Sequence, residues 1–158
     1  METITKNISA LALRGLTVFP RMTASFDVER EISVRALERA METGQEIFLV
    51  TQRELGVELP EEKDLYEVGT VARVIQILRA SNSMMRVVME GGSRARLRRL
   101  WQREPFLQAQ VELIGEEKSP RHGTRTEAML RQTYALFGEY SELLPKQPES
   151  VFTTVMDA

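Results

Sequence analysis

The chain contains no cysteine and only one histidine, His122, among its 158 residues. The lack of cysteine excludes disulfide bonds and thiolate nucleophiles, and it gives no support to secretion. One histidine without cysteine cannot build a zinc site or a Cys–His pair. His122 lies in a polar stretch that is typical of an exposed linker. We therefore expect neither a metal site nor thiol chemistry in this chain.

Long apolar runs and a strong net charge are also lacking. No apolar run approaches the roughly 20 residues that a membrane-spanning helix needs. The opening sequence METITKNIS has neither the basic start nor the apolar stretch of a signal peptide. The net charge of −2 does not favour nucleic acid or an anionic membrane as a partner of the whole chain. We expect a globular, cytoplasmic protein without a membrane partner.

The motifs of common catalytic sites are missing as well. The chain has no G-x-x-x-x-G-K-[ST] sequence to cradle a nucleoside triphosphate. Its four lysines lie in expected tails, loops or linkers, where none can be buried beside a serine as a base. The acidic stretch from Glu58 to Asp64 lacks the glycine-punctuated spacing of a cation-binding loop. We therefore expect no catalytic, cofactor-binding or metal-binding residues, and neither ATPase nor peptidase activity from this chain alone.

What the chain does contain is a series of strand-like patterns. Between Phe106 and Ile114 the apolar residues alternate, as on one face of a strand. The small polar residues 79–83 separate two β-rich runs and predict a hairpin. Gly91-Gly92 interrupts the second of these runs, which indicates a bulge or a sharp bend. The strands expected from such patterns cover residues 8–13, 22–28, 47–50, 68–78, 84–97 and 106–114. These strands predict an α+β fold with about six mostly antiparallel strands in a curved sheet.

Helical patterns occur in two places. Val34, Leu37 and Met41 form an apolar stripe, and Gly44 lies where a left-handed residue is expected to end that helix. A second helical segment is expected from Thr124, with Glu127 completing a capping box. We predict a β domain over residues 7–117, a linker over 118–123 and a helical segment over 124–158. The apolar face at the end of that segment has no partner in the sequence, so we expect it to be truncated.

Four blocks in a fixed order carry a family resemblance: Leu11 to Pro20 (LALRGLTVFP), Gln45 to Gln52 (QEIFLVTQ), Asp64 to Ala72 (DLYEVGTVA) and Val87 to Arg96 (VVMEGGSRAR). In this order and at these separations they resemble the N-terminal domain of the Lon family of ATP-dependent proteases. Two residues depart from the usual pattern. Ala12 stands where the family usually has proline, and Gly92 stands where it usually has a larger apolar residue.

The resemblance implies a PUA-like pseudo-barrel followed by the start of a helical segment. It further implies a non-catalytic domain that recognises unfolded or damaged proteins and delivers them to an ATPase and protease ring. The remaining domains of the same protease would be its partners. The implied full-length protein is a hexameric, cytoplasmic ATP-dependent serine endopeptidase of protein quality control that uses ATP and Mg.

The candidate substrate-binding residues are apolar residues in expected turns, namely Phe19, Pro20, Met22, Met84 and Met85. Unfolded polypeptides share exposed apolar side chains, and methionine is flexible enough to accept many shapes. Burying one large apolar side chain is worth roughly 1.5–3 kcal/mol, so a small patch gives weak, reversible contact. An alternative stays open, in which Val18 and Phe19 plug the end of the barrel and one methionine packs beneath.

A basic stretch supports a second hypothesis, a nucleic-acid-binding PUA-like module. Its candidate contacts are Arg94, Arg96, Arg98, Arg99 and Trp101, with Arg103 nearby. On a strand, the first three arginines share one face, and an aromatic residue beside them can stack on a base. The alternative is a solvated sheet face whose arginines pair with the many glutamates.

Overall fold

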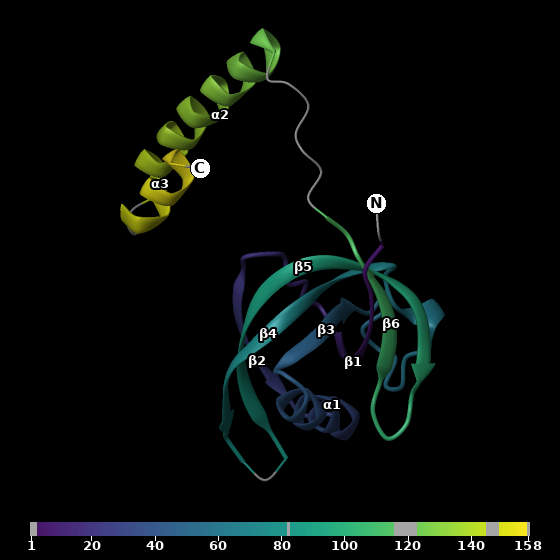
Figure 1. Cartoon of the computed structure of the whole chain (residues 1–158). Coiled ribbons are helices and arrows are strands. Elements are labelled where there is room, and N and C mark those ends of the chain that lie inside the picture. The colour runs from purple at the N-terminus through teal and green to yellow at the C-terminus, as the bar shows by residue number, and fades with distance from the viewer. Residues whose placement is uncertain (1–2, 82, 116–122, 145–148, 158) are drawn as a thin grey trace. The chain divides into compact units, whose positions relative to one another are not determined.

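The computed structural model describes residues 3–81, 83–115, 123–144 and 149–157 (Figure 1). The chain divides into two compact units, residues 1–115 and 116–158. The first unit holds the whole β-sheet, and the second holds two helices.

The first unit is a strongly curved six-stranded sheet with one long helix. Its elements are β1 (Thr5–Leu13), β2 (Thr23–Val28), α1 (Glu31–Glu42), β3 (Glu46–Thr51), the short 3-10 helix η1 (Glu62–Asp64), β4 (Val68–Arg79), β5 (Met85–Gln102) and β6 (Gln108–Leu113). β5 pairs with β4 and also with β6, so β5, β4, β3, β1 and β6 close into a ring, while β2 adds to the first half of β5. β1 and β3 are parallel, and the other strand pairs among the described residues are antiparallel. The predicted α+β pseudo-barrel is therefore confirmed.

The bend of β5 depends on the two glycines that the sequence singled out. Between Thr70 and Ala72 on β4 the register shifts, because β5 has an extra residue between Gly91 and Arg94. A Cβ atom on Gly92 would lie 2.6 Å from the carbonyl oxygen of Val71. The predicted bulge is confirmed, and at Gly92 a larger side chain would collide with β4.

The core consists of two apolar clusters on opposite faces of β3. Ile47 and Leu49 belong to the cluster that α1 covers, and Phe48 and Val50 to the cluster inside the barrel. All four are buried, as the continuous apolar run predicts. β3 is therefore packed on both of its faces.

Helix α1 ends as the sequence predicts. Gly44 has a φ of 102°, and the N–H of Gln45 donates to the carbonyl of Ala40 at 2.8 Å. These are the marks of a Schellman motif, which satisfies a terminal helix carbonyl. The chain can therefore turn at once from α1 into β3.

The second unit contains α2 (Thr124–Leu143) and α3 (Glu149–Met156), in agreement with the predicted helical segment. The expected capping box is wrong. Gly123 is the N-cap residue, so Thr124 already belongs to the first turn, and the Glu127 carboxylate pairs with Arg131 at 2.7 Å. Residues 116–122, which include His122 and most of the expected linker, lie outside the described residues. Within the described ranges, no helix is long and apolar enough to cross a membrane.

Candidate functional site

A tight turn holds the first predicted apolar site in place. The N–H of Met22 donates to the carbonyl of Phe19 at 3.1 Å, with Pro20 in the second position and Arg21 at a φ of 65°. Proline followed by a residue with positive φ defines a type II turn. The turn is bonded to β5, because Arg21 N–H donates to the Gly91 carbonyl and Gly91 N–H donates to the Met22 carbonyl, both at 2.8 Å.

The turn exposes one aromatic side chain and buries its neighbour. Phe19 is 55% exposed, whereas Val18 is buried in the core and its carbonyl accepts a 2.7 Å bond from the hydroxyl of Thr70. Pro20 is half-buried, and Met22 packs partly against the α1-covered core. Neither residue plugs the barrel: Val18 is buried in the α1-covered cluster and Phe19 is exposed to solvent.

The second predicted site is the tip of the β4–β5 hairpin, where one methionine is accessible and the other is buried. Met85 is only 6% exposed, because strand alternation directs it to the same inner face as Val87 and Met89. Met84 is half-buried, and its carbonyl accepts a 3.1 Å bond from the N–H of Ala80. The two neighbouring methionines therefore face opposite sides: Met84 is partly accessible, and Met85 packs beneath the tip.

The structure does not bring the two predicted sites together. β2 runs between them, with Thr23 opposite Glu90 near the turn and Val28 opposite Met85 at the tip. Five steps along a strand span roughly 17 Å. The turn and the tip are thus separate apolar points at the two ends of one strand.

Two exposed apolar residues on β4 were missed by the sequence reasoning. Ile75 is 55% exposed and Leu78 is 51% exposed. A register shift between Val74 and Gln76 places Ile75 outside the regular alternation. The continuous run Val-Ile-Gln-Ile-Leu was the available signal, but its division between the two faces depends on a bulge that sequence periodicity does not locate.

The arginines of β5 are largely engaged with acidic partners. Arg96 pairs with Glu67 at 3.5 Å, and Arg98 forms a short ion pair with Glu112. Arg103 donates to the carbonyls of Leu59 and Pro60 at 3.1 and 3.3 Å, and it lies 3.9 Å from the carboxylate of Glu61. Arg94 and Arg99 are exposed without an ion pair among the described residues, and Trp101 is 43% exposed. Ala95 is fully buried, as expected, but a register shift between Leu97 and Arg99 breaks the predicted alternation.

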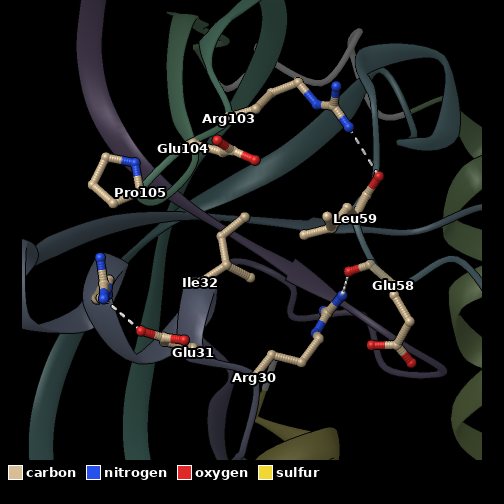
Figure 2. Close-up of a pocket in the computed structure, with 9 residues that line it drawn as sticks. Arg30, Glu31, Ile32, Glu58, Leu59, Arg103, Glu104 and Pro105 are labelled. Atoms are coloured by element: carbon tan, nitrogen blue, oxygen red, sulfur yellow. Dashed lines mark hydrogen bonds and ion pairs between the residues drawn. The ribbon is translucent and has the colours of Figure 1, made fainter.

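A hollow of about 760 Å³ lies where the start of α1, the loop before η1 and the β5–β6 turn meet (Figure 2). Its lining residues are Arg30, Glu31, Ile32, Arg35, Glu58, Leu59, Arg103, Glu104 and Pro105. Arg35 pairs with Glu31 at 2.5 Å, and the guanidinium of Arg103 is bonded to the Leu59 carbonyl. Charges of both signs are balanced around the apolar side chains, so the hollow attracts neither anions nor cations strongly.

Arg30 supports the wall of this hollow. Its guanidinium donates to the Ala12 carbonyl at 2.5 Å, the Gln52 side-chain oxygen at 2.7 Å and the Glu58 carbonyl at 3.2 Å. Burial lowers the pKa of Arg30 from its usual value and the nearby charge of Arg14 adds to this, while Glu58 raises it. The guanidinium still stays protonated at neutral pH, because arginine starts from a very high pKa. Its bonds make Arg30 a structural support rather than a proton donor.

No group of three or more histidine, cysteine or acidic residues among the described residues is arranged to hold a metal ion. The exposed side chains include apolar ones, such as Phe19 at the turn, which can bind another polypeptide weakly.

Comparison with known proteins identifies the family of the chain. The family model of the ATP-dependent protease La (LON) substrate-binding domain matches residues 7–157. The Lon protease of Brevibacillus choshinensis is 38% identical over 152 residues, which cover 96% of this chain and 19% of that protein. Lon protease 1 of Bacillus subtilis (strain 168) is 34% identical over 156 residues, covering 99% of this chain and 20% of that protein.

Solved structures share the fold. The N-terminal domain of a Mycobacterium avium complex Lon protease gives a TM-score of 0.66 at 14% identity, covering 97% of this chain and 76% of that one. A Lon N-terminal domain protein from Xanthomonas campestris gives 0.62 at 13% identity, covering 95% of this chain and 89% of that one. The chain spans about one fifth of the length of the curated relatives it matches. With its barrel, its helical segment and a family match over nearly its whole length, the chain belongs to the Lon substrate-binding domain family.

Proposed function

We propose that this chain recognises unfolded or damaged polypeptides through exposed apolar side chains and delivers them to the ATPase and protease parts of the same protein. The observation that carries the proposal is Phe19, a 55% exposed aromatic residue on a turn fixed by backbone bonds to β5. An exposed phenylalanine on a flexible loop would fold back onto the protein. A rigid turn keeps the ring available to a partner at little entropic cost.

The proposed contact residues follow from exposure. Phe19 is the main contact, with Pro20 and Met22 beside it, and Met84 is a second contact at the hairpin tip, supported from beneath by Met85. Each contact buries little area, so binding is weak. Weak binding lets the domain release the substrate, which must then pass to the ATPase and protease parts of the protein.

The whole protein is proposed to be a hexameric, cytoplasmic ATP-dependent serine endopeptidase that acts in protein quality control. This rests on the relatives named above, which are Lon proteases and of which this chain matches about one fifth. ATP and Mg would be bound by other parts of that protein. In this proposal, residues 7–117 form the recognition domain, and residues 124–158 lead from it toward the ring.

Replacement of Phe19 by serine tests the recognition surface. Binding of a reduced and alkylated protein that cannot refold is expected to weaken about three- to tenfold in Phe19→Ser, since one large apolar contact is lost. Leu55→Ser is the matched control, because Leu55 is 62% exposed in the loop after β3. Equal affinity of Phe19→Ser and the native chain, measured by fluorescence anisotropy, would contradict the proposed surface.

The nucleic-acid hypothesis has less support. Arg94 and Arg99 beside the exposed Trp101 favour it. However, Arg96, Arg98 and Arg103 have acidic or carbonyl partners within the protein. Binding of single-stranded nucleic acid requires a continuous basic groove. Two arginines and one aromatic ring form only a small part of such a groove.

A further inference from the structure

β2 has a free edge. Among the described residues it pairs with β5 and with no other strand, and it is the end strand of the sheet order (Figure 1). The unpaired N–H and C=O groups of an edge strand can pair with an added strand. The edge of β2 is therefore a possible binding surface in its own right.

The backbone bonds at the start of β2 decide which residues face that edge. Gly91 exchanges bonds with Arg21 and Met22, so it is a hydrogen-bonded position between the two strands. In an antiparallel pair, such positions alternate with positions whose backbone groups point away from the partner. By this alternation, the backbone N–H and C=O groups point away from β5 at Thr23, Ser25 and Asp27. Within the described residues, no loop or side chain is bonded to these backbone groups.

The edge joins the two apolar points of the proposed recognition surface. β2 begins directly after the turn that exposes Phe19, and it ends opposite Met85, beside the half-buried Met84. A polypeptide lying along β2 would thus reach both points, which are too far apart for one side chain to bridge.

A cleft beside β2 offers room for side chains. It has a volume of about 260 Å³ and lies between the end of β1 and the second half of β2. Its lining combines apolar residues with polar ones, namely Leu11, Ala12, Leu13, Leu16, Phe26 and Val28 with Arg14, Asp27, Glu29, Arg30 and Ser33. In an added strand every second side chain would face inward, toward this cleft, and the others would face solvent.

We infer that β2 binds an extended segment of an unfolded polypeptide by strand addition, with apolar residues at alternate positions of that segment. This inference rests on the proposed function and adds the mode of binding. The segment's backbone pairs with Thr23, Ser25 and Asp27, and its inward side chains enter the cleft. Folded proteins offer far less free backbone for such pairing, because most of their strands are already paired. The short edge, since β2 has only six residues, keeps the added strand short and its release easy.

The test uses a ten-residue synthetic peptide with alternating apolar residues and the same peptide N-methylated at every central residue. N-methylation keeps the side chains but removes the N–H groups needed for pairing. The methylated peptide is expected to bind at least fivefold more weakly to the native chain. On the protein, Ser25→Pro removes one outward N–H without touching the β5 ladder, and Ser25→Ala keeps that N–H. Ser25→Pro should weaken binding about fivefold, and Ser25→Ala should not.

The remaining results separate the inference from the proposed function. Equal binding of both peptides to the native chain overturns strand addition, whether or not Ser25→Pro folds. If Phe19→Ser still weakens binding in that case, apolar capture stands without pairing. If Phe19→Ser has no effect either, both the capture and its mode are wrong.

Discussion

At the scale of the residue, Gly91 explains how the turn that exposes Phe19 is held against β5. A Cβ atom at this position would lie 2.1 Å from the carbonyl oxygen of Phe19. The close approach lets Gly91 exchange backbone bonds with Arg21 and Met22. Only glycine allows the turn to lie this near to β5.

Gly91→Ala is therefore expected to destabilise the first unit by roughly 1–3 kcal/mol, because a backbone atom must move to make room. Gly56→Ala is the control, since a Cβ atom there meets nothing within 4 Å. Its effect should lie within about 0.5 kcal/mol. Urea unfolding followed by the fluorescence of the single tryptophan, Trp101, measures both. Equal midpoints for the two variants would contradict this account of the turn.

Asp27 and Arg86 form an ion pair at 2.9 Å across β2 and β5. The hydrogen bond from Arg86 lowers the pKa of Asp27, and its positive charge lowers it further. A depressed carboxyl pKa adds stability above the unfolded-state value, and this contribution is lost as pH falls through the folded-state value. Because both groups are solvated, the contribution is small.

NMR titration of the Asp27 carboxyl is expected to give a pKa below the usual range for aspartate in the native chain. In Arg86→Met it should return toward the usual value, since both favourable interactions are removed. The same pKa in both proteins would show that the pair does not persist in solution.

At the scale of the elements, the loop between β3 and η1 is held in place by side-chain hydrogen bonds from Gln52 and Arg30. Gln52 is 3% exposed, and its amide donates to the carbonyls of Val57 and Glu54 at 2.8 and 3.1 Å. Its oxygen accepts the 2.7 Å bond from Arg30. The loop has little regular structure, so these side-chain bonds replace a strand ladder.

Gln52→Ala is expected to destabilise the first unit by roughly 1–3 kcal/mol, because the partly buried bonds to two loop carbonyls and to Arg30 are lost. It should also open the loop to proteolysis near Glu54. Gln76→Ala, on the exposed face of β4, is the control and should change neither property. Limited proteolysis with mass spectrometry, together with urea unfolding, checks the prediction. A loop that is cut at the same rate in both variants would contradict it.

The elements themselves could be predicted because each leaves a periodic signal. The six strands, the stripe of α1 and the bulge at Gly92 were all visible in the sequence. The positive φ of Arg21 was not, because a turn of this kind usually takes glycine at that position. The exposure of Ile75 was missed for a similar reason, since a second bulge shifts the register within an apolar run. Bulges and long-range contacts decide which of two apolar neighbours faces solvent, and periodicity alone does not record them.

At the scale of the whole molecule, the proposed apolar recognition predicts how binding depends on salt. The apolar points at Phe19 and Met84 lie at the ends of β2, and the arginines of β5 are mostly paired. Apolar capture and phosphate binding respond oppositely to salt. Apolar contact holds or tightens as salt rises, whereas binding to phosphates weakens steeply.

The most direct test is the affinity of the chain for a reduced and alkylated protein and for its native, folded form, each at 50 and 500 mM salt. The account predicts binding of the unfolded form only, with an affinity that is unchanged or higher at 500 mM. A single-stranded oligonucleotide run in parallel is expected to bind weakly at 50 mM and not at 500 mM. Equal affinity for the folded and unfolded forms, or binding of the unfolded form that disappears at high salt, would contradict apolar recognition.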